Sequence, residues 1–384
     1  MRILQILPAL NSGGVERGTV DLAQALVKAG HQAFVASNGG RLVHRLDRIG
    51  ATHYQLALHS KNPFIIALNT YRLKRLIKDE KIDLVHVRSR APAWSAYYAA
   101  KQTNTPLVTT FHGTYNFKNY FKKAYNAVMT KGNRVIAVSN YIKTHILSHY
   151  AVDESKITVI ARGIDLEQFH QNRVRPDHLQ SLAQKWRLPD DRPIIMLPAR
   201  ITKWKGHLFL MDALEKLAEM LRSNDPTLEH PFHCVLVGDE QGAQPYVAEI
   251  TAKIDRLKLQ GMVQFVGHTD DIPTSLMLAD VVVSTSLDPE AFGRTTVEAQ
   301  AMGRPVIAPA HGGALEQIED GVTGWLYRPH DVDGLANALR QAIALRQAGR
   351  AKLAFAARRN VEANFSLAQM TSSTIALYED LIAR

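Results

Sequence analysis

The stretch RILQILPALNSGGVERGTVDLAQALVKAGHQAFVAS, residues 2–37, carries the pattern that decides the fold. It begins with an apolar run of strand length at residues 2–7. Residues 18–29 then place apolar side chains on one helical face, namely Val20, Leu22, Ala23, Leu26 and Val27. Gly30 ends this helix, as helix-stop glycines do, and residues 33–37 form a second strand. Two strands joined by a helix favour a parallel sheet.

The same alternation of strands and helices fills the rest of the chain. In the first half, further strands are predicted at residues 84–87, 107–110 and 134–138. After a polar, proline-containing stretch at 165–192, the pattern restarts. Strands are then predicted at 194–197, 234–237, 263–266, 281–284 and 305–308, and helices at 208–223, 296–302 and 332–347.

A length of 384 residues is too great for one ordinary core. We therefore predict two Rossmann-like, doubly wound parallel-sheet α/β domains, at residues 1–170 and 190–365. Ligands of such sheets bind at the carboxyl ends of the strands. We expect the two domains to face each other across a cleft that holds the active site.

The composition is typical of a globular protein, with 46% apolar residues. Cys234 is the one cysteine and stands in an apolar run, which predicts a buried core residue and fits a reducing compartment. The opening apolar run stops at Pro8, so a first strand is a better interpretation than a signal peptide. No run approaches the roughly 20 apolar residues of a spanning helix. We expect a cytoplasmic protein that sits at most on the surface of a membrane.

Positive charge is concentrated in the first 170 residues, which hold 23 Lys and Arg against 10 Asp and Glu, in a chain of net charge +10. This imbalance indicates an anionic partner there, such as acidic lipid headgroups, an acidic glycan or nucleic acid. Residues 116–125 interleave lysines with aromatic residues, as helices at a membrane surface do. A solvated basic face with core aromatics explains the same pattern, and the sequence leaves both explanations open.

The segment DPEAFGRTTVEAQAMG, residues 288–303, has the pattern of a ligand-binding loop that leads into a helix near Thr295. The start of a helix leaves backbone N–H groups unpaired and attracts a pyrophosphate, and Gly293 lets the backbone approach a ligand closely. Glu290 could accept hydrogen bonds from sugar hydroxyls, and Glu298, in the first turn, from the two hydroxyls of a ribose. Alternatively, Thr295 and Glu298 form a capping box that only closes the helix.

Two cations follow the predicted strand at 194–197, namely Arg200 and Lys205. Two cations placed about 3–4 Å from a phosphate group would each contribute several kcal/mol to stabilising negative charge that develops on it. Two surface cations that flank a loop are the alternative explanation.

Evidence for a metal site is poor. Asp331 and Asp333 form a D-x-D sequence, but they open a predicted helix, which favours helix capping. The 16 histidines show no ligand spacing. We predict no metal ligands and no cofactor.

The segment that begins at Glu290 resembles the E-x7-E signature of glycosyltransferase family 4 and its relatives with the GT-B fold. The pattern E-x-F-G-x4-E-A-x-A-x-G-x-P-V is matched by Glu290, Phe292, Gly293, Glu298, Ala299, Ala301, Gly303, Pro305 and Val306. The family's R-x4-K-G is matched by Arg200, Lys205 and Gly206, with Ala199 where a glycine is common.

The resemblance extends through the first half of the chain. Gly13 and Gly14 belong to a G-G-x-E-R loop, and His112 matches the family histidine that faces the donor sugar. Arg162 replaces the asparagine of I-P-N-G-V-D, and His268 ends a segment similar to the family's F-x-G. Residues from about 366 to 384 resemble the final helix, which returns to the first domain.

This resemblance implies a retaining, metal-independent glycosyltransferase that uses a nucleoside-diphosphate sugar, UDP favoured over GDP. The catalytic residues would be Arg200, Lys205, Glu290 and His112. The donor would contact Gly13, Gly14, Phe292, Gly293, Arg294, Thr295, Glu298 and His268. An acceptor, either a glycan or a lipid-linked molecule, would meet Arg88, Arg90, Tyr115 and Arg162 in the first domain.

The expected pathway is the synthesis of bacterial lipopolysaccharide or another surface glycan, with peripheral contact to the inner face of the plasma membrane as one option. Nucleic acid is not the expected partner. Two alternatives stay open at this point. One is a sugar-nucleotide epimerase of the same architecture, and the other is a nucleic-acid-binding protein that uses the basic first half.

Overall fold

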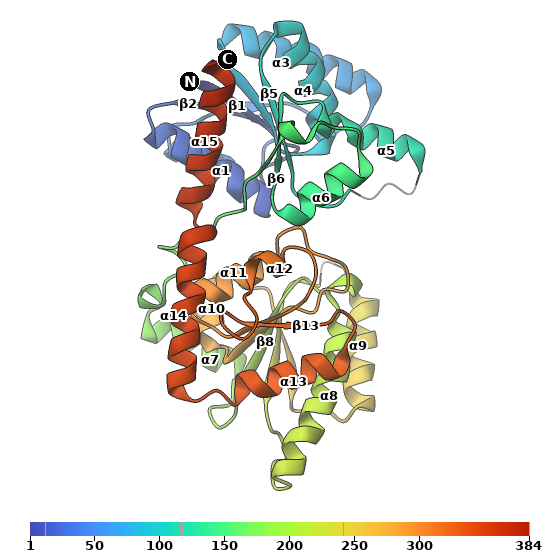
Figure 1. Ribbon diagram of the computed structural model, residues 1–384, viewed down its shortest axis with the longest axis vertical. Coiled ribbons are helices and arrows are strands. Elements are labelled where there is room, and N and C mark those ends of the chain that lie inside the picture. Colours follow the sequence, from blue (N-terminus) through green and yellow to red (C-terminus); the bar gives the residue numbers. More distant parts are fainter. Residues whose placement is uncertain (12, 116–118, 241, 384) are drawn as a thin grey trace. The chain divides into compact units, whose positions relative to one another are not determined.

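The computed structural model describes residues 1–11, 13–115, 119–240 and 242–383 of the chain. The chain divides into two compact units (Figure 1). The first unit contains Met1–Gly163 together with Leu367–Arg384, and the second contains Ile164–Ser366. Each unit holds one parallel sheet with helices packed against it.

The sheet of the first unit has the strand order β3-β2-β1-β4-β5-β6-β7, and all of its neighbouring strands are parallel. The strands are β1 (Arg2–Ile6), β2 (Gln32–Ser37), β3 (Thr52–Gln55), β4 (Leu84–Val87), β5 (Leu107–Phe111), β6 (Arg134–Ala137) and β7 (Ile157–Val159). β1 and β4 are almost continuously buried, as strands covered on both faces are. The strand order reverses between β1 and β4, and ligands of such sheets generally bind at the carboxyl ends of the strands at this reversal.

The helices of the first unit cover this sheet (Figure 1). They are α1 (Gly14–Lys28), α2 (Val43–Arg48), α3 (Pro63–Asp79), α4 (Arg90–Thr103), α5 (Tyr120–Asn126), α6 (Asn140–His149) and α15 (Leu367–Ala383). The C-terminal helix α15 packs against α1. Its Tyr378 is buried and its hydroxyl forms a hydrogen bond with Nδ1 of His86 on β4. This contact fixes the end of the chain to the centre of the first sheet.

The sheet of the second unit has the order β10-β9-β8-β11-β12-β13, again entirely parallel. The strands are β8 (Ile194–Pro198), β9 (His233–Val237), β10 (Val263–Gly267), β11 (Val281–Val283), β12 (Val306–Pro309) and β13 (Trp325–Tyr327). The helices are α7 (Pro176–Trp186), α8 (His207–Asn224), α9 (Gln244–Arg256), α10 (Ile272–Leu278), α11 (Arg294–Ala301), α12 (Ala314–Gln317), α13 (Val332–Ile343) and α14 (Gln347–Asn364). Here the order reverses between β8 and β11, and the loops after these two strands hold the predicted donor residues.

The predicted fold class is confirmed, because both sheets are parallel and covered by helices. Cys234 is fully buried in the core of the second unit, as its apolar run predicts. The prediction of one helix at 332–347 is wrong: α13 ends at Ile343, and α14 begins at Gln347 as a separate helix. Within the described part of the chain, no helix is both long and apolar enough to cross a bilayer.

Candidate active site

The loops that follow β8 and β11 are joined to each other at the carboxyl edge of the second sheet. β8 and β11 are adjacent parallel strands, so their carboxyl ends lie at the same edge. The hydroxyl of Thr285 donates to the carbonyl oxygen of Lys205 at 2.8 Å. The backbone N–H of Leu287 donates to the carbonyl oxygen of Trp204, also at 2.8 Å. These contacts hold the loop of the predicted cations against the loop of Glu290.

Lys205 and Glu290 form an ion pair at this edge of the sheet. Nζ of Lys205 lies 2.7 Å from Oε1 of Glu290, and the two side chains are only 15% and 23% exposed. The hydroxyl of Ser286 donates to the same oxygen at 2.5 Å, and Nζ of Lys205 also lies 4.3 Å from the centre of the Trp204 ring. Oε2 of Glu290 has no partner among the described residues. One carboxylate oxygen is therefore held by the protein, and the other is available to a ligand.

Arg200 lies on the same loop as Lys205 but in a different environment. Its side chain is exposed, and among the described residues its guanidinium has no partner in a hydrogen bond or ion pair. The structure thus brings Lys205 to Glu290 and leaves the side chain of Arg200, on the same loop as Lys205, exposed to solvent.

The backbone of residues 290–292 is held by Gly313 and Gln317. The N–H of Gly313 donates to the carbonyl oxygen of Glu290 at 2.9 Å. A Cβ atom at Gly313 would lie 2.6 Å from the carbonyl oxygen of Phe292, so only glycine fits there. The buried amide of Gln317 donates to this same carbonyl, and the ring of Phe292 is buried against Phe365. Gly313 and Gln317 therefore set the position of Glu290.

Helix α11 begins without a side-chain cap, so the alternative of a capping box at Thr295 and Glu298 is wrong. Gly293 takes the N-cap position with a φ of 78°, and no side chain caps this described helix start. The hydroxyl of Thr295 instead donates to the carbonyl oxygen of Pro198 at 3.3 Å. The N–H of Thr296 donates to the carbonyl oxygen of Gly293 at 3.2 Å, which leaves the N–H groups of Arg294 and Thr295 at this helix start available to an anion.

The position predicted for Glu298 also needs correction, because it is the fifth residue of α11 and lies beyond the first turn. Its Oε1 accepts from Nε of Arg294 at 3.0 Å. The two side chains are 13% and 27% exposed, respectively. Arg294 therefore fixes the carboxylate of Glu298.

The remaining predicted residue of the second unit, His268, follows β10 on the surface. Its Nε2 lies 3.2 Å from the carboxylate of Asp270. Asp331 caps α13 by accepting from the N–H of Gly334 at 2.8 Å, which confirms the capping interpretation of the D-x-D sequence. Within the described residues, no group of three or more His, Cys, Asp or Glu side chains lies close enough to hold a metal ion.

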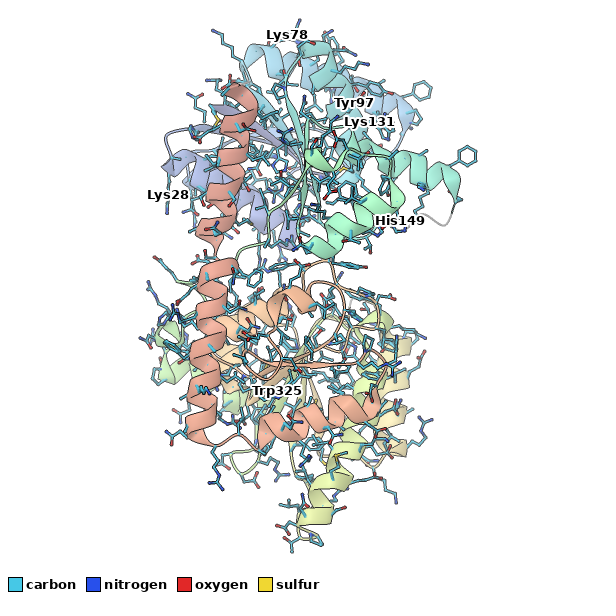
Figure 2. All side chains as sticks on the ribbon, in the orientation of Figure 1. Lys28, Lys78, Tyr97, Lys131, His149 and Trp325 are labelled. Atoms are coloured by element: carbon cyan, nitrogen blue, oxygen red, sulfur yellow. The ribbon has the colours of Figure 1, made fainter. Side chains whose placement is uncertain are left out.

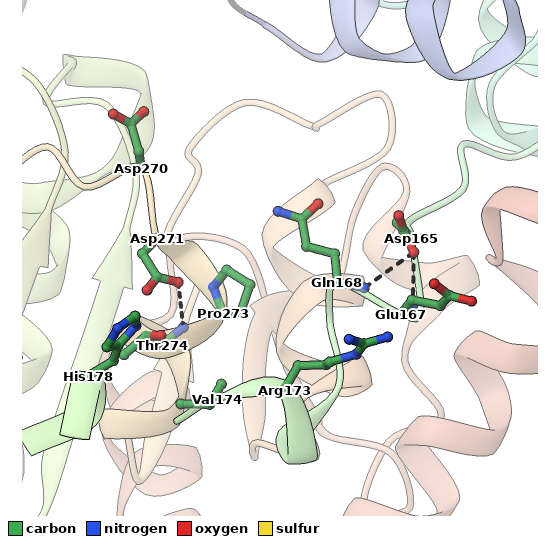
Figure 3. Close-up of a pocket in the computed structure, with 10 residues that line it drawn as sticks. All are labelled: Asp165, Glu167, Gln168, Arg173, Val174, His178, Asp270, Asp271, Pro273 and Thr274. Carbon is green, nitrogen blue, oxygen red and sulfur yellow. Dashed lines mark hydrogen bonds between the residues drawn. The ribbon is translucent and has the colours of Figure 1, made fainter. Parts of the chain in front are cut away.

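A separate hollow in the second unit, of about 620 Å³, is acidic (Figure 3). Two of its carboxylates serve the backbone: Asp165 accepts from the N–H groups of Glu167 and Gln168, and Asp271 caps α10 through Thr274. Its lining also includes Arg173, Val174, His178, Asp270 and Pro273. It includes none of the predicted donor residues.

In the first unit, two arginines border the start of α1. Gly13 is the N-cap of this helix, and no side chain caps it among the described residues. A Cβ atom at Gly14 would lie 2.9 Å from both terminal nitrogens of Arg162, and one at Gly18 would lie 3.2 Å from Arg88. The backbone of α1 thus approaches both guanidinium groups closely, and Arg88 is buried.

His112 follows β5 and is electrically neutral near pH 7. Both of its ring nitrogens are buried and lack a hydrogen-bond partner among the described residues. Burial holds the pKa of His112 well below 6.5, and the charges of Arg162 and Arg88 lower it further. The ring is therefore a neutral donor and acceptor of hydrogen bonds.

Arg90 and Tyr115, predicted to meet the acceptor, pack against each other. The guanidinium of Arg90 lies 4.2 Å from the ring centre of Tyr115, and its Nη1 donates to Asn126 at 3.1 Å. Tyr115 is buried and stacks on Phe111 with ring centres 4.8 Å apart. This geometry gives both side chains a structural role, and their contact with an acceptor stays a prediction.

The basic aromatic stretch at 116–125 is described only in part, because residues 116–118 lie outside the described residues. Helix α5 begins at Tyr120, and the side chain of Phe121 is 84% exposed. The explanation by core aromatics is therefore wrong for Phe121.

Sequence reasoning missed the residues that support the predicted ones. Ser286 and Trp204 hold the Lys205–Glu290 pair, and Gln317 holds the carbonyl of Phe292. Trp204 stands next to Lys205 in the chain, which was a usable signal. Ser286 and Gln317 act through contacts that only the folded loops create.

Two family models match the chain. Glycosyltransferase Family 4 matches residues 12–168, and Glycosyl transferases group 1 matches residues 180–360. The solved structure of a glycosyltransferase from Rickettsia africae ESF-5 is 41% identical in sequence, with a TM-score of 0.90. That alignment covers 99% of this chain and 98% of the Rickettsia chain. The protein belongs to the group 1 glycosyltransferases of family 4 type, which have the GT-B fold.

More distant relatives agree with this family. Anabaena HepE, solved in complex with UDP, is 25% identical, with a TM-score of 0.83 and coverage of 99% of this chain and 100% of its own. The D-inositol 3-phosphate glycosyltransferase of Salinispora arenicola (strain CNS-205) is 28% identical over 321 residues, which are 78% of this chain and 69% of the relative. The corresponding enzyme of Salinispora tropica is matched over 64% of its length, so these relatives extend beyond the shared part. The predicted family is confirmed, and neither the epimerase nor the nucleic-acid-binding alternative finds support in these matches.

Proposed function

We propose that this glycosyltransferase moves a sugar from a nucleoside-diphosphate sugar to an acceptor hydroxyl with retention of the anomeric configuration. The observation that carries the proposal is the pair of Lys205 and Glu290, 2.7 Å apart, at the reversal point of the second sheet. A cation for a phosphate and a carboxylate for sugar hydroxyls thus stand side by side near the uncapped start of α11.

The donor is a UDP-sugar in this proposal. The complex of Anabaena HepE with UDP, at 25% identity over nearly the whole chain, supports that choice. The acceptor is a glycan or lipid-linked molecule of bacterial surface-glycan synthesis, such as lipopolysaccharide, and the family resemblance supports that choice.

The reaction breaks the bond between the anomeric carbon and the diphosphate oxygen. As this bond lengthens, negative charge grows on the diphosphate, and Lys205 and Arg200 stabilise it. The acceptor hydroxyl attacks the face from which the diphosphate leaves, and a phosphate oxygen takes the hydroxyl proton. The new glycosidic bond then forms, and the nucleoside diphosphate is released. These two cations supply the positive charge, so the proposed reaction needs no metal.

Other residues hold the donor. Oε2 of Glu290 accepts from sugar hydroxyls while Oε1 stays with Lys205 and Ser286. Glu298, fixed by Arg294, accepts from the ribose hydroxyls. His112 of the first unit, kept neutral by burial, exchanges hydrogen bonds with the sugar.

Product analysis tests the proposal. The enzyme is incubated with UDP-glucose, UDP-galactose or UDP-N-acetylglucosamine and a panel of glycan acceptors, and the anomeric configuration of the product is read by NMR. Transfer with the donor's configuration is the expected result. An inverted product would remove the retaining mechanism, and conversion of the donor sugar without an acceptor would point to an epimerase.

A further inference from the structure

The first unit has an apolar groove beside α3 and α4 that the proposed reaction does not use. The groove has a volume of about 740 Å³, within the range of roughly 300–1,000 Å³ of ligand pockets. Its walls include Ile66 and Tyr71 of α3 and Trp94 and Tyr98 of α4. The rings of Trp94 and Tyr98 stack with centres 5.7 Å apart. Nε1 of Trp94 donates to the carbonyl oxygen of Tyr125 at 3.1 Å, so the polar edge of the indole is already satisfied.

The groove lies in a strongly cationic region of the chain. Lys61 and Lys74 line it directly. Residues 48–152 contain 16 Lys and Arg against three Asp and Glu, and all three acidic residues lie within 79–83. Figure 2 shows Lys131 beside Tyr97, whose ring centre lies 5.6 Å from the lysine nitrogen. Such a charge distribution favours an acidic partner.

Large apolar side chains on the helices beside the groove are exposed to solvent. Phe64 on α3 and Phe121 on α5 are each 84% exposed, and Leu68 on α3 is 45% exposed. Tyr71 and Tyr98, at the groove itself, are 58% and 44% exposed. Exposed apolar groups in such numbers mark an interaction surface, and their mixture with lysines is typical of protein faces that lie in the headgroup region of a bilayer.

We propose that this groove binds an acyl chain of an acidic phospholipid and thereby seats the face formed by α3, α4 and α5 on an anionic membrane. The acyl chain in the groove and the lysines around it act together. Each buried methylene of the chain strengthens binding only about fourfold, and one acyl chain alone binds a protein to a membrane weakly. The lysines supply the second attraction, to the phosphate headgroups. A second copy of this chain fits the groove less well, since a symmetric contact would oppose two cationic faces.

The fluorescence of Trp94, which lines the groove, can report on binding there. Of the four tryptophans in the sequence, Trp94 is the one in the first unit. Phospholipids with brominated acyl chains quench tryptophan fluorescence only at short range. Vesicles of brominated phosphatidylglycerol at low salt should therefore bind the protein and quench its fluorescence, and brominated phosphatidylcholine should do so at least tenfold more weakly. The Trp94→Phe variant should bind the acidic vesicles within threefold of the wild type without this quenching.

Matched variants separate the groove from general adsorption. Tyr71→Ser and Lys74→Glu should each weaken vesicle binding at least fivefold. The controls are Phe355→Ser, which replaces another exposed aromatic (66% exposed), and Lys352→Glu, both on α14, and they should leave binding unchanged. All four variants should keep the thermal stabilisation by UDP. If UDP does not stabilise the wild type either, the donor proposal fails, and this result is independent of vesicle binding.

Three outcomes would overturn the proposal. Binding to acidic vesicles without quenching of Trp94 would show contact by charge alone. Absence of binding to acidic vesicles at low salt would remove the membrane as partner. Self-association that Tyr71→Ser abolishes, measured by analytical ultracentrifugation without lipid, would assign the groove to a second copy of the chain.

Discussion

Nζ of Lys205 lies 2.7 Å from Oε1 of Glu290, and the hydroxyl of Ser286 donates to that same oxygen. Both ionised side chains are mostly shielded from water, which strengthens their attraction. In the proposed reaction, a donor diphosphate that approaches Lys205 would compete with Glu290 for the lysine's charge. The hydrogen bond from Ser286 would hold Glu290 in place during this exchange.

Replacing Lys205 with alanine should lower kcat roughly 100- to 1,000-fold, because the charge that the lysine meets develops in the transition state. The KM for the donor should change much less. Arg200→Ala should act in the same direction. Steady-state kinetics with the UDP-sugar measures both effects. Lys203→Ala is the matched control, because Lys203 belongs to the same loop but is 72% exposed and pairs with Glu249 at the surface. Unchanged turnover in Lys205→Ala would remove the proposed mechanism.

Glu298→Gln should raise the KM for the donor roughly 10- to 100-fold, because two hydrogen bonds from ribose hydroxyls lose a charged acceptor. The value of kcat should fall less, since these contacts exist before and during the reaction. Isothermal titration with UDP gives the loss of affinity directly. Glu362→Gln is the control: Glu362 forms a similar pair with Arg358 four residues away on α14. Equal UDP affinity in wild type and Glu298→Gln would contradict the ribose assignment.

Gly313→Ala should damage donor binding without changing any polar group. The new methyl carbon would lie 2.6 Å from the carbonyl oxygen of Phe292, so the loop that carries Glu290 must move. We expect a loss of roughly 1–3 kcal/mol in the free energy of unfolding and a loss of stabilisation by UDP. Thermal unfolding with and without UDP measures both. Gly349→Ala, in helix α14, should leave UDP binding intact. A Gly313→Ala protein with normal UDP stabilisation would show that the position of this loop does not control the site.

Chelation should leave turnover intact. In the proposed reaction, Arg200 and Lys205 supply the positive charge that a bound metal ion supplies to phosphate oxygens in other enzymes. Initial rates after dialysis against EDTA, compared with rates in added Mg²⁺ or Mn²⁺, test this. A rate that collapses in EDTA and returns with one of these ions would require a metal in the mechanism.

The sequence predicted the fold and the position of the candidate site well where strands were fully buried. Residues 84–87 were predicted as a strand and form β4 with those bounds. Three short strands, β3, β7 and β13, were not predicted; unlike β4, they are only partly buried. The ends of β8 and β11 meet because the strand order reverses between them, and this adjacency brings together Lys205 and Glu290, 85 residues apart in sequence.

Local chemistry depended on contacts that no sequence spacing shows. Thr295 and Glu298 have the spacing of a capping box. However, the hydroxyl of Thr295 donates to the carbonyl oxygen of Pro198, and the carboxylate of Glu298 accepts from Arg294. Gly293, with its positive φ, then becomes the N-cap. His112 was placed correctly at the end of a strand. Its neutral state follows from burial and from Arg162 and Arg88, which the fold brings close.

The buried His207, the first residue of α8, should make stability depend on pH. Burial lowers the pKa of His207 from 6.5 to about 4. Between these values the unfolded chain binds a proton that the folded protein does not, so stability rises with pH there and falls on acidification. The free energy of unfolding should drop about 1.4 kcal/mol per pH unit, about 3 kcal/mol in all, between pH 6.5 and pH 4 from this group.

Urea unfolding at several pH values between 7 and 4.5 gives the free energy of unfolding as a function of pH. The contribution of His207 is the difference between the slopes of this dependence in the wild type and in His207→Gln. The variant should be less stable at pH 7 but lose less stability on acidification. Tyr246→Phe controls for packing, because its ring contacts that of His207 with centres 6.0 Å apart and its hydroxyl does not ionise in this range. It should lower stability equally at every pH. Parallel slopes for wild type and His207→Gln would show that His207 takes up its proton in the folded protein as easily as in the unfolded chain.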